Sequence, residues 1–349
     1  MTLVNTLMQT LRSLATPTFD ANELRESRYG ALRFFQQESA SRPIFDGETI
    51  ANIKRSFGNS VIVPVLDAQT VTVSNTYART CSVVDDENTS ALVTLSFASY
   101  GWGFSMTPST HYNNDVAYQR DWERKMNKYL LQFTSDLDTA CIAVLEADKN
   151  QVTTGVSDYY AIVADALQVP QASKDDFYNQ LEAIFNTMDF YDNIHIITNP
   201  GHMPMVRRLD NQGSSNATNQ GFQFDLRGYQ WWGSNRLANG VGVESTAYAV
   251  EAGTVFIDNR NDPDTIAGHN VGGFKVWSQE QMPMVNMLMG SFYQEDCGDQ
   301  NALAGAATAG NTRSKLEGFE FSTDIVTATQ YNSSISTRYN PILKAEILD

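Results

Sequence analysis

The chain has 349 residues, of which 42% are hydrophobic and only 18% charged, and its formal net charge is −16. This apolar share is too high for a disordered chain, and no apolar run approaches the roughly 18 residues of a transmembrane helix. The acidic balance argues against a dedicated nucleic-acid-binding protein, because phosphate binding relies on clustered cations. The few basic groupings are the dispersed set Arg120, Arg124, Lys125 and Lys128, and the pair Arg207–Arg208.

Short helices separated by prolines are predicted for the first part of the chain, 1–57. Met1–Ala15 is expected to form an amphipathic helix rather than a signal peptide, because it lacks a basic start and a sustained apolar core. Asp20–Ala40 and Asp46–Phe57 carry apolar residues at roughly helical spacing. None of these pieces has a large apolar face of its own, so we expect an arm that lies on another surface.

A long hairpin or extended loop is predicted for 58–110. Its apolar or β-branched runs are separated by turn residues, and a polar tip, Asp85–Ser90, lies between two of them. The runs are Val61–Leu66, Thr70–Ser74, Thr80–Val84 and Ala91–Phe97.

Three aromatic residues, Tyr100, Trp102 and Phe104, follow the hairpin at intervals of two. Side chains at this spacing share one face of a strand. That face is either packed inside the subunit or exposed as a surface that docks on a neighbouring subunit.

One long helix is predicted from Asn114 to Asp148, a stretch without glycine or proline. Its apolar residues recur at spacings of three and four: Trp122, Met126, Tyr129, Phe133, Leu137, Ala140 and Val144. About 35 residues at 1.5 Å each give a rod of about 50 Å. The apolar repeat is not sustained elsewhere, so a brace within a mixed α/β domain is favoured over a coiled coil.

The stretch 153–317 is predicted to be mixed α/β, and 318–349 to return to strands. A strand is expected at Ile194–Thr198 and a helix at His202–Leu209. Further strands are expected at Phe222–Asp225, Tyr229–Gly233 and Tyr248–Asp258.

No catalytic, cofactor-binding or metal-binding residue is predicted. Phosphate-loop, HExxH and GxSxG motifs are absent from the sequence, and its four histidines are scattered. His195 lies within an apolar strand and is interpreted as a core histidine, whereas His202 is interpreted as a helix cap or surface residue. The acidic loop 258–264 is interpreted as a solvated turn rather than a Ca²⁺ site, because Pro263 replaces the glycine of an EF-hand.

The three cysteines, Cys81, Cys141 and Cys297, are too widely spaced for a disulfide framework or a zinc site. We expect reduced thiols in an intracellular chain. Cys141 lies among apolar neighbours on the long helix, where it is interpreted as a small core residue.

The order of these zones resembles the major capsid proteins of tailed phages, which have the HK97-type fold. Short stretches support the resemblance: Arg227–Leu237 is similar to the glycine, hydrophobic strand and Ser-Asn order of their A-domains, and Ile194–Asn199 followed by His202–Leu209 looks like the strand-then-helix unit. The resemblance implies an α+β fold with five regions. They are an N-terminal arm (1–57), an E-loop hairpin (58–110), a P-domain with the spine helix (111–152), an A-domain (153–317), and returning P-domain strands with the C-terminus (318–349).

The resemblance also implies a structural protein rather than an enzyme. It would assemble with itself, as hexamers and pentamers, into an icosahedral shell around the phage genome, with Tyr100, Trp102 and Phe104 as subunit-interface residues. It would be assembled in the host cytoplasm and located in the virion. Implied partners are a separate scaffolding protein, a portal, decoration proteins, and packaged double-stranded DNA held by weak nonspecific contact; no cofactor or membrane is implied.

Three other interpretations remain open from the sequence. An encapsulin-like nanocompartment shares the fold but encloses cargo enzymes. A tail-tube or other virion protein is disfavoured by the long helix. An enzyme with an unrecognised site would require a convergent polar pocket.

Overall fold

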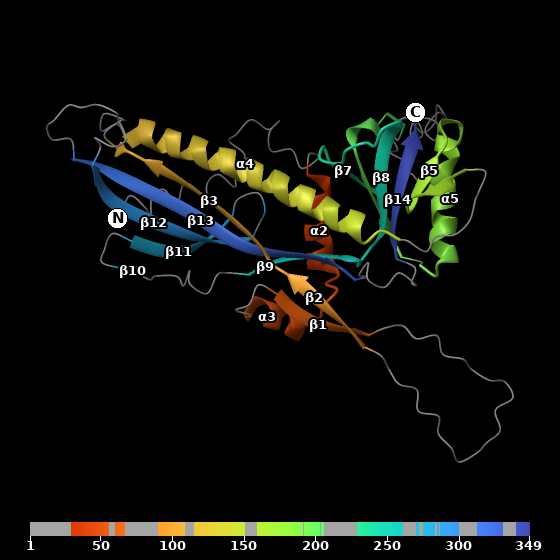
Figure 1. Ribbon diagram of the computed structural model, residues 1–349, viewed down its shortest axis with the longest axis horizontal. Coiled ribbons are helices and arrows are strands. Elements are labelled where there is room, and N and C mark those ends of the chain that lie inside the picture. Colours follow the sequence, from red (N-terminus) through yellow and green to blue (C-terminus); the bar gives the residue numbers. More distant parts are fainter. Residues whose placement is uncertain are drawn as a thin grey trace, which may run out of the picture.

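The computed structural model describes residues 29–55, 60–66, 90–108, 115–150, 159–190, 192–202, 204–205, 229–260, 270–271, 275–282, 285, 287–299, 313–330 and 340–349. Two six-stranded sheets, one long helix and an N-terminal helical region form this part of the chain (Figure 1). None of the described helices combines the length and the apolar character that crossing a bilayer requires.

The first sheet, termed the elongated sheet, is antiparallel throughout. Its strand order is β10-β11-β12-β13-β3, and β9 pairs with the end of β13. The 17-residue strand β13 is therefore the element that joins strands from distant parts of the sequence. The strands are β3 (Ala98–Met106), β9 (Val255–Arg260), β10 (Asn270–Val271), β11 (Lys275–Gln281), β12 (Leu288–Asp299) and β13 (Arg313–Thr329).

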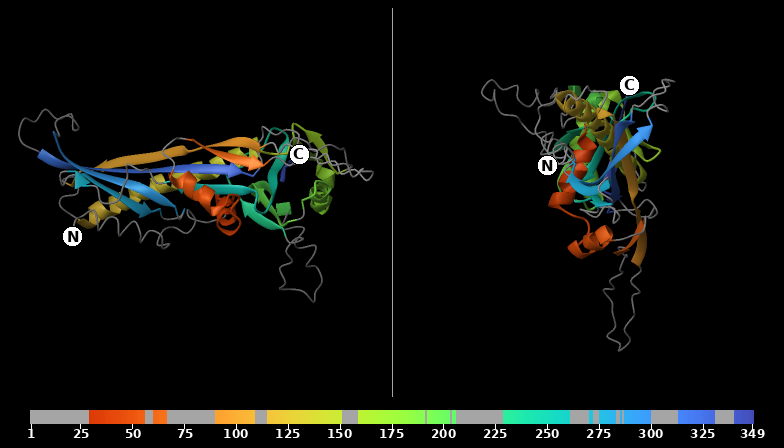
Figure 2. Two further views of the ribbon diagram at one scale, coloured as in Figure 1. Left: turned by 90° about the horizontal axis from the view of Figure 1, so that it is seen from below. Right: turned by 90° about the vertical axis from the view of Figure 1, so that its left-hand side faces the viewer.

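The helix α4, Asp115–Ala147, lies along one face of the elongated sheet (Figure 1 and Figure 2). The prediction of a single helix over Asn114–Asp148 is confirmed to within one residue at each end. Its core-facing side chains include Trp122, Met126, Leu130, Phe133, Leu137, Cys141 and Leu145.

The predicted apolar face of α4 is only partly buried at three positions. Tyr129 is 37% exposed, and Ala140 and Val144 are half-buried. Cys141 and Leu145 are fully buried instead. The physical reason is a change of packing partner, because the second half of α4 lies against helix α2, which local periodicity does not reveal.

The second sheet has the strand order β4-β5-β14-β8-β6-β7. The β14–β5 and β6–β7 pairs are parallel and the others antiparallel. Helix α5 (Lys174–Thr187) supplies Phe177, Leu181 and Phe185 to its core. The strands are β4 (Ala161–Val163), β5 (Ala166–Val169), β6 (Ile194–Thr198), β7 (Gln230–Gly233), β8 (Val243–Glu251) and β14 (Ile342–Leu348); short 3-10 turns lie at η3 (Gln171–Ser173) and η4 (Pro200–His202).

Two helices and a two-stranded hairpin make up the rest of the described chain. They are α2 (Gly30–Ser41), α3 (Gly47–Arg55), β1 (Ser60–Leu66) and β2 (Ser90–Ser96). The strands β1 and β2 pair antiparallel, and their base packs with residues of α3, β9 and β13 in a small apolar cluster. In Figure 1 the hairpin and α3 lie on the opposite side of the elongated sheet from α4.

Two sequence expectations require correction. The stretch 153–317 does not form one unit, because β9 to β12 pair within the elongated sheet. The single strand expected at Tyr248–Asp258 is two strands, because the chain turns between β8 and β9. Alternating apolar residues identify a strand but not its pairing partner. Most of the helix expected at His202–Leu209 lies outside the described residues; Pro204 and Met205 are helical and follow the 3-10 turn η4. The strands expected at Thr70–Ser74, Thr80–Val84 and Phe222–Asp225 lie outside the described residues.

Candidate subunit-assembly site

The aromatic residues Tyr100, Trp102 and Phe104 share one face of β3, and that face is turned toward α4. Trp102 stacks on Phe321 at a centroid distance of 5.8 Å and lies 5.1 Å from Phe133 of α4. Each of the three side chains is half-buried and packs against the main core. Further aromatic contacts include Tyr100–Phe133 (5.4 Å), Phe104–Tyr129 (6.0 Å) and Phe104–Phe319 (5.5 Å). Most of each ring is therefore used to hold helix and sheet together within the subunit.

The joint between α2 and the body is organised by Asp138 of α4, which is fully buried. Its Oδ1 accepts a hydrogen bond from the backbone N–H of Leu32 at 2.8 Å, in the first turn of α2. Its Oδ2 accepts from the Ser234 hydroxyl, just after β7. One carboxylate thus caps α2 and ties it to both the long helix and the second sheet.

Burial raises the pKa of Asp138, although the hydrogen bonds from Ser234 and Leu32 act in the opposite direction. The charge of Arg236 also favours the ionised form. The Arg236 guanidinium lies 5.3 Å from the ring centroid of Tyr29, and its Nε donates to Ser135 Oγ of α4 at 2.7 Å. The Arg236 side chain therefore connects Tyr29, just before α2, with Ser135 of α4 at the same joint.

Close backbone contact completes the joint. Tyr29 forms an antiparallel bridge with Ser234. A Cβ added at Gly30 would lie 2.5 Å from the carbonyl oxygen of Gly233. Position 30 therefore requires glycine, because any side chain would push α2 away from β7.

A second buried contact ties α2 to the second sheet. Glu38 of α2 and His195 of β6 are each 3% exposed, and their Oε1 and Nε2 atoms are 3.6 Å apart. Trp232 Nε1 donates to His195 Nδ1 at 3.2 Å, which leaves Nε2 as the protonated nitrogen of the neutral ring. Burial lowers the pKa of His195 and outweighs the opposing charge of Glu38. The interpretation of His195 as a core histidine is confirmed.

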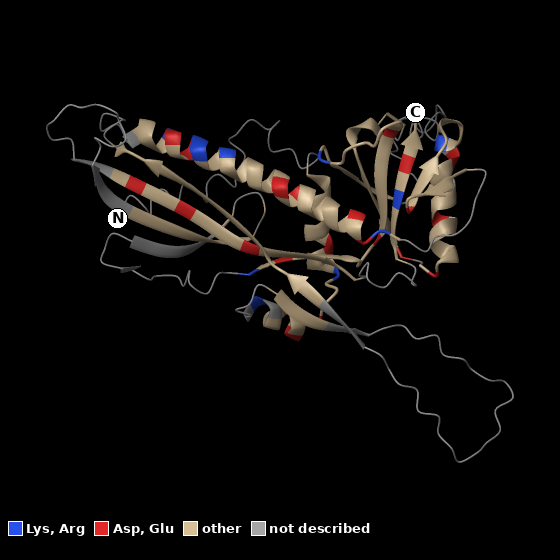
Figure 3. Ribbon diagram, in the orientation of Figure 1, with Lys and Arg blue, Asp and Glu red and all other residues tan. Residues whose placement is uncertain are grey.

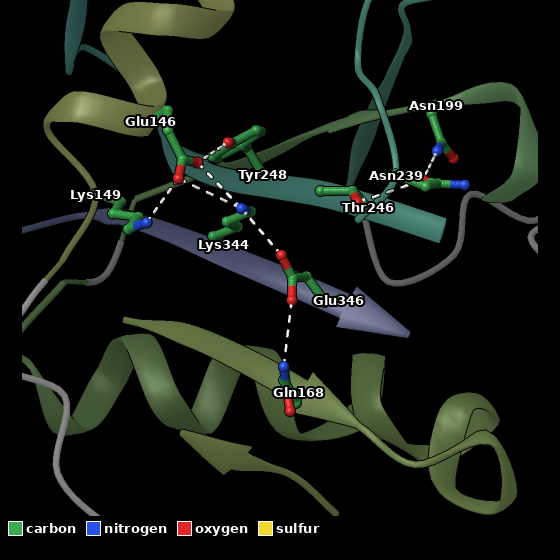
Figure 4. A network of polar contacts seen from close by, with 9 residues as sticks. All are labelled: Glu146, Lys149, Gln168, Asn199, Asn239, Thr246, Tyr248, Lys344 and Glu346. Carbon is green, nitrogen blue, oxygen red and sulfur yellow. Dashed lines mark hydrogen bonds and ion pairs between the residues drawn. The ribbon is translucent and has the colours of Figure 1, made fainter. Parts of the chain in front are cut away.

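The C-terminal end of α4 is fixed to the second sheet by a polar network centred on Glu146 (Figure 4). The two Glu146 oxygens accept from Lys149 at 2.7 Å and pair with Lys344 of β14 at 3.2 Å, and Tyr248 of β8 donates to the same carboxylate. Lys344 also pairs with Glu346 at 3.0 Å. Burial opposes ionisation of Glu146, but these partners outweigh it and lower its pKa.

The sequence suggested that His202 is a helix cap or a surface residue, but the structure shows that it is fully buried. Its Nδ1 lies 2.7 Å from Ser245 Oγ, and its ring contacts Tyr178 and Trp231. Burial lowers its pKa to about 4. A neutral core histidine fits this environment.

The described residues contain no group of three or more histidine, cysteine or acidic side chains that could hold a metal ion. Cys141 is buried, as expected for a core residue, and burial raises the pKa of its thiol. In the acidic loop 258–264, Asp258 pairs with Lys54 at 3.0 Å and Arg260 with Asp324 at 2.8 Å. Residues 261–264, His111, His269, Cys81 and Arg207–Arg208 lie outside the described residues.

Surface suited to assembly lies on the hairpin and around α2. Ile62 of β1 is 61% exposed. An open groove of about 980 Å³ runs between α2, α3 and β9, and Trp231, Trp232 and Leu288 contribute to its lining. These elements therefore present apolar surface that the described part of the subunit leaves uncovered.

Sequence reasoning missed Asp138, Glu38 and Gly30, which hold the α2 joint. A signal existed for the first two: Asp138 directly follows the core residue Leu137, and Glu38 lies three and four residues after Phe35 and Phe34, on the same face of a helix. Such a position predicts a buried carboxylate with a specific partner. The partner itself, as far as 106 residues away for Asp138 and Leu32, is set by tertiary structure.

No family model and no curated protein matches the chain. The solved structure named "Mycobacterium phage Che8" is similar over 86% of this chain and 89% of its own, at 11% identity and a TM-score of 0.50. "Cyanophage Pam1 capsid asymmetric unit" has 11% identity, 85% and 87% coverage and a TM-score of 0.48. "Asymmetric unit of bacteriophage PhiM1 mature capsid" has 9% identity, 83% and 82% coverage and a TM-score of 0.46.

At this level of identity, the similarity to the Che8 structure establishes the fold. It extends over 86% of this chain, which folds as a long helix on an elongated antiparallel sheet beside a second sheet. The expected fold class is confirmed: the chain has the α+β, HK97-type fold of tailed-phage capsid proteins.

Proposed function

We propose that the chain is the major capsid protein of a tailed phage, with a structural rather than a catalytic role. The observation that carries the proposal is the HK97-type arrangement of its elements, together with apolar surface on elements that stand away from the body. Extended elements of this kind gain their stability from burial against neighbouring copies. Its principal partner is therefore a second copy of the same chain.

The finer parts of the proposal concern assembly. We expect hexamers and pentamers that form an icosahedral shell, assembled in the host cytoplasm and located in the virion. A scaffolding protein, a portal and decoration proteins are proposed partners. Packaged double-stranded DNA is proposed to make weak nonspecific contacts only, since the chain carries a net charge of −16.

The division into regions is proposed with one revision. Strand pairing supports a P-domain made of α4, β3 and β9 to β13, and an A-domain made of β4 to β8, α5 and β14. The arm keeps its proposed range of 1–57 and the hairpin that of 58–110, except that β3 pairs as a P-domain strand.

The interface role of Tyr100, Trp102 and Phe104 stays a prediction. Their contacts with α4 support the other interpretation, a packing face inside the subunit. For an intersubunit contact the hairpin residue Ile62 is the better candidate, since it is 61% exposed. Burying the exposed part of one isoleucine contributes about 1 to 2 kcal/mol per copy.

Electron microscopy of the purified, full-length protein tests the proposal, with and without particles from its source. Closed icosahedral shells are expected for the wild type, and Ile62→Asp should prevent them while leaving a folded, soluble subunit. Ile62→Thr, which keeps β-branching without adding charge, is the matched control and should weaken assembly less. A monomer that never assembles with any viral partner would refute the proposal. Shells filled with a cargo enzyme instead of DNA would favour the nanocompartment interpretation.

A further inference from the structure

Three cations form a row on the outer side of α4. Arg120, Arg124 and Lys128 are all exposed and are four residues apart, so each lies about 6 Å further along the helix than the one before. Trp122 and Met126, on the opposite side of the same turns, are fully buried. The row therefore points away from the elongated sheet, and the blue segments of α4 in Figure 3 mark this half of the helix.

The row is unusual because its charges are not compensated. No carboxylate of the described residues lies within ion-pair distance of these three side chains. Among the other described cations, seven have such a pair, and Arg33 and Arg236 do not. The compensated pairs are Arg42–Asp192, Lys54–Asp258, Lys125–Asp121, Lys149–Glu146, Lys174–Glu244, Arg260–Asp324 and Lys344–Glu346. In a protein with a net charge of −16, this row is a local positive strip on an acidic molecule.

The strip does not stabilise the fold. Like charges four residues apart on a helix cost about 0.2 to 0.5 kcal/mol per pair, and the side chains cover no apolar partner in the described structure. Uncompensated cations at regular spacing do attract polyanions, because they can release the counterions condensed on phosphates.

We propose that the Arg120–Arg124–Lys128 row contacts the phosphate backbone of double-stranded DNA inside the shell, and that α4 therefore faces the shell interior. This inference rests on the proposed capsid function. Three cations make a weak contact that reads no sequence, since phosphates carry no base information. The rest of the surface is acidic and repels phosphates, so each subunit contacts the packaged DNA only through this row.

The competing partner is the outer face of the elongated sheet in a second copy. That face carries acidic residues on β13, but Asp324 already pairs with Arg260 and accepts from Ser99 at 2.6 Å. Among the acidic side chains of that face that the structure describes, Glu320 alone is exposed without an ion pair. One such carboxylate does not complement a row of three cations, whereas a duplex presents a charge about every 1.7 Å along its axis.

The test compares two triple variants with the same net charge. R120Q/R124Q/K128Q removes the row, and R42Q/K54Q/K174Q removes three cations that are already paired elsewhere. Fluorescence anisotropy of the unassembled subunit with a labelled 20-base-pair duplex, at 20 to 200 mM salt, measures log K against log salt. The row variant should lower the steepness of this slope by about 2.7, which is 0.9 for each lost contact, and the control should lower it by less than one.

Electron microscopy of shells provides the second measurement. In wild-type shells α4 should line the inner surface, and the row variant should still close into shells. Unchanged duplex binding by the row variant, equal loss in the control, or α4 on the outer surface would overturn the inference. Loss of assembly with unchanged duplex binding would assign the row to a contact with a second copy. Wild-type protein that binds duplex through the row but forms no shells would refute the proposed function instead.

Discussion

Replacing Asp138 with alanine should detach the N-terminus of α2 from the body of the subunit. The substitution leaves the Leu32 N–H, now 2.8 Å from Oδ1, without its cap, which costs about 1 kcal/mol. The buried hydroxyl of Ser234 also loses its acceptor, and an unsatisfied buried polar group costs about 1 to 3 kcal/mol. We therefore expect the free energy of unfolding to fall by about 2 to 4 kcal/mol.

Asparagine at the same position should be much milder. Its amide oxygen can accept from Leu32, and its NH₂ group can donate to Ser234, so both contacts survive. Burial raises the folded-state pKa of Asp138 above its unfolded value. The stability that this group contributes is therefore fully present below the unfolded pKa, near 3.9, and is lost as pH rises through the folded pKa. At neutral pH the wild type buries a charge that asparagine lacks, so Asp138→Asn should cost less than about 1 kcal/mol.

Urea unfolding of the unassembled subunit, followed by circular dichroism at pH 7, measures both differences. Protease cleavage near α2 gives a local measurement, because a detached helix is cut before the body unfolds. Asp138→Ala within about 0.5 kcal/mol of wild type would refute the capping argument. So would an Asp138→Asn variant as unstable as the alanine variant, since the loss would then come from charge rather than from hydrogen bonds.

Three further predictions concern other buried positions. Burial lowers the pKa of His202 to about 4, below its unfolded value of about 6.5, so its stabilising contribution is present above pH 6.5 and lost as pH falls through 4. Urea midpoints should record a loss of up to about 3 kcal/mol between pH 7 and 4, and this loss should shrink in His202→Gln. Trp102→Ala should lower the melting temperature of the isolated subunit by removing about 2 to 4 kcal/mol of packing; an unchanged melting temperature with failed assembly would restore the interface interpretation. Gly30→Ala should destabilise α2, because its Cβ would lie 2.5 Å from Gly233 O, and hydrogen exchange in α2 should increase while exchange in α5 stays unchanged.

The long helix was predictable because its information is local. A stretch without helix breakers and with an apolar residue every three or four positions has few alternatives. Ala140 and Val144 are only half-buried, in the half of α4 that contacts α2 through Asp138. From that point the buried face is decided by a partner about 100 residues earlier in the chain, which no helical pattern contains.

The pairing of the strands was not predictable in the same way. The sequence predicts one strand over Tyr248–Asp258, but the chain turns after Glu251, and Val255–Arg260 pairs with β13 rather than continuing β8. The polar joints are equally non-local. Asp138, Glu38 and Glu146 are ordinary acidic residues of helices until the fold brings Ser234, His195 and Lys344 to them.

The two halves of α4 use charge in opposite ways. In the second half, the carboxylates of Asp138 and Glu146 are turned toward the protein and join the arm and the second sheet to the helix. In the first half, aromatic packing against β3 holds the helix in place, together with hydrogen bonds from Tyr118 to Glu317 of β13 and from Lys125 to the Ser105 carbonyl. Arg120, Arg124 and Lys128 take no part in these contacts; they are exposed and form no ion pair with the residues that the structure describes. A helix fixed in this way at both ends can present a row of cations without depending on them for its own stability.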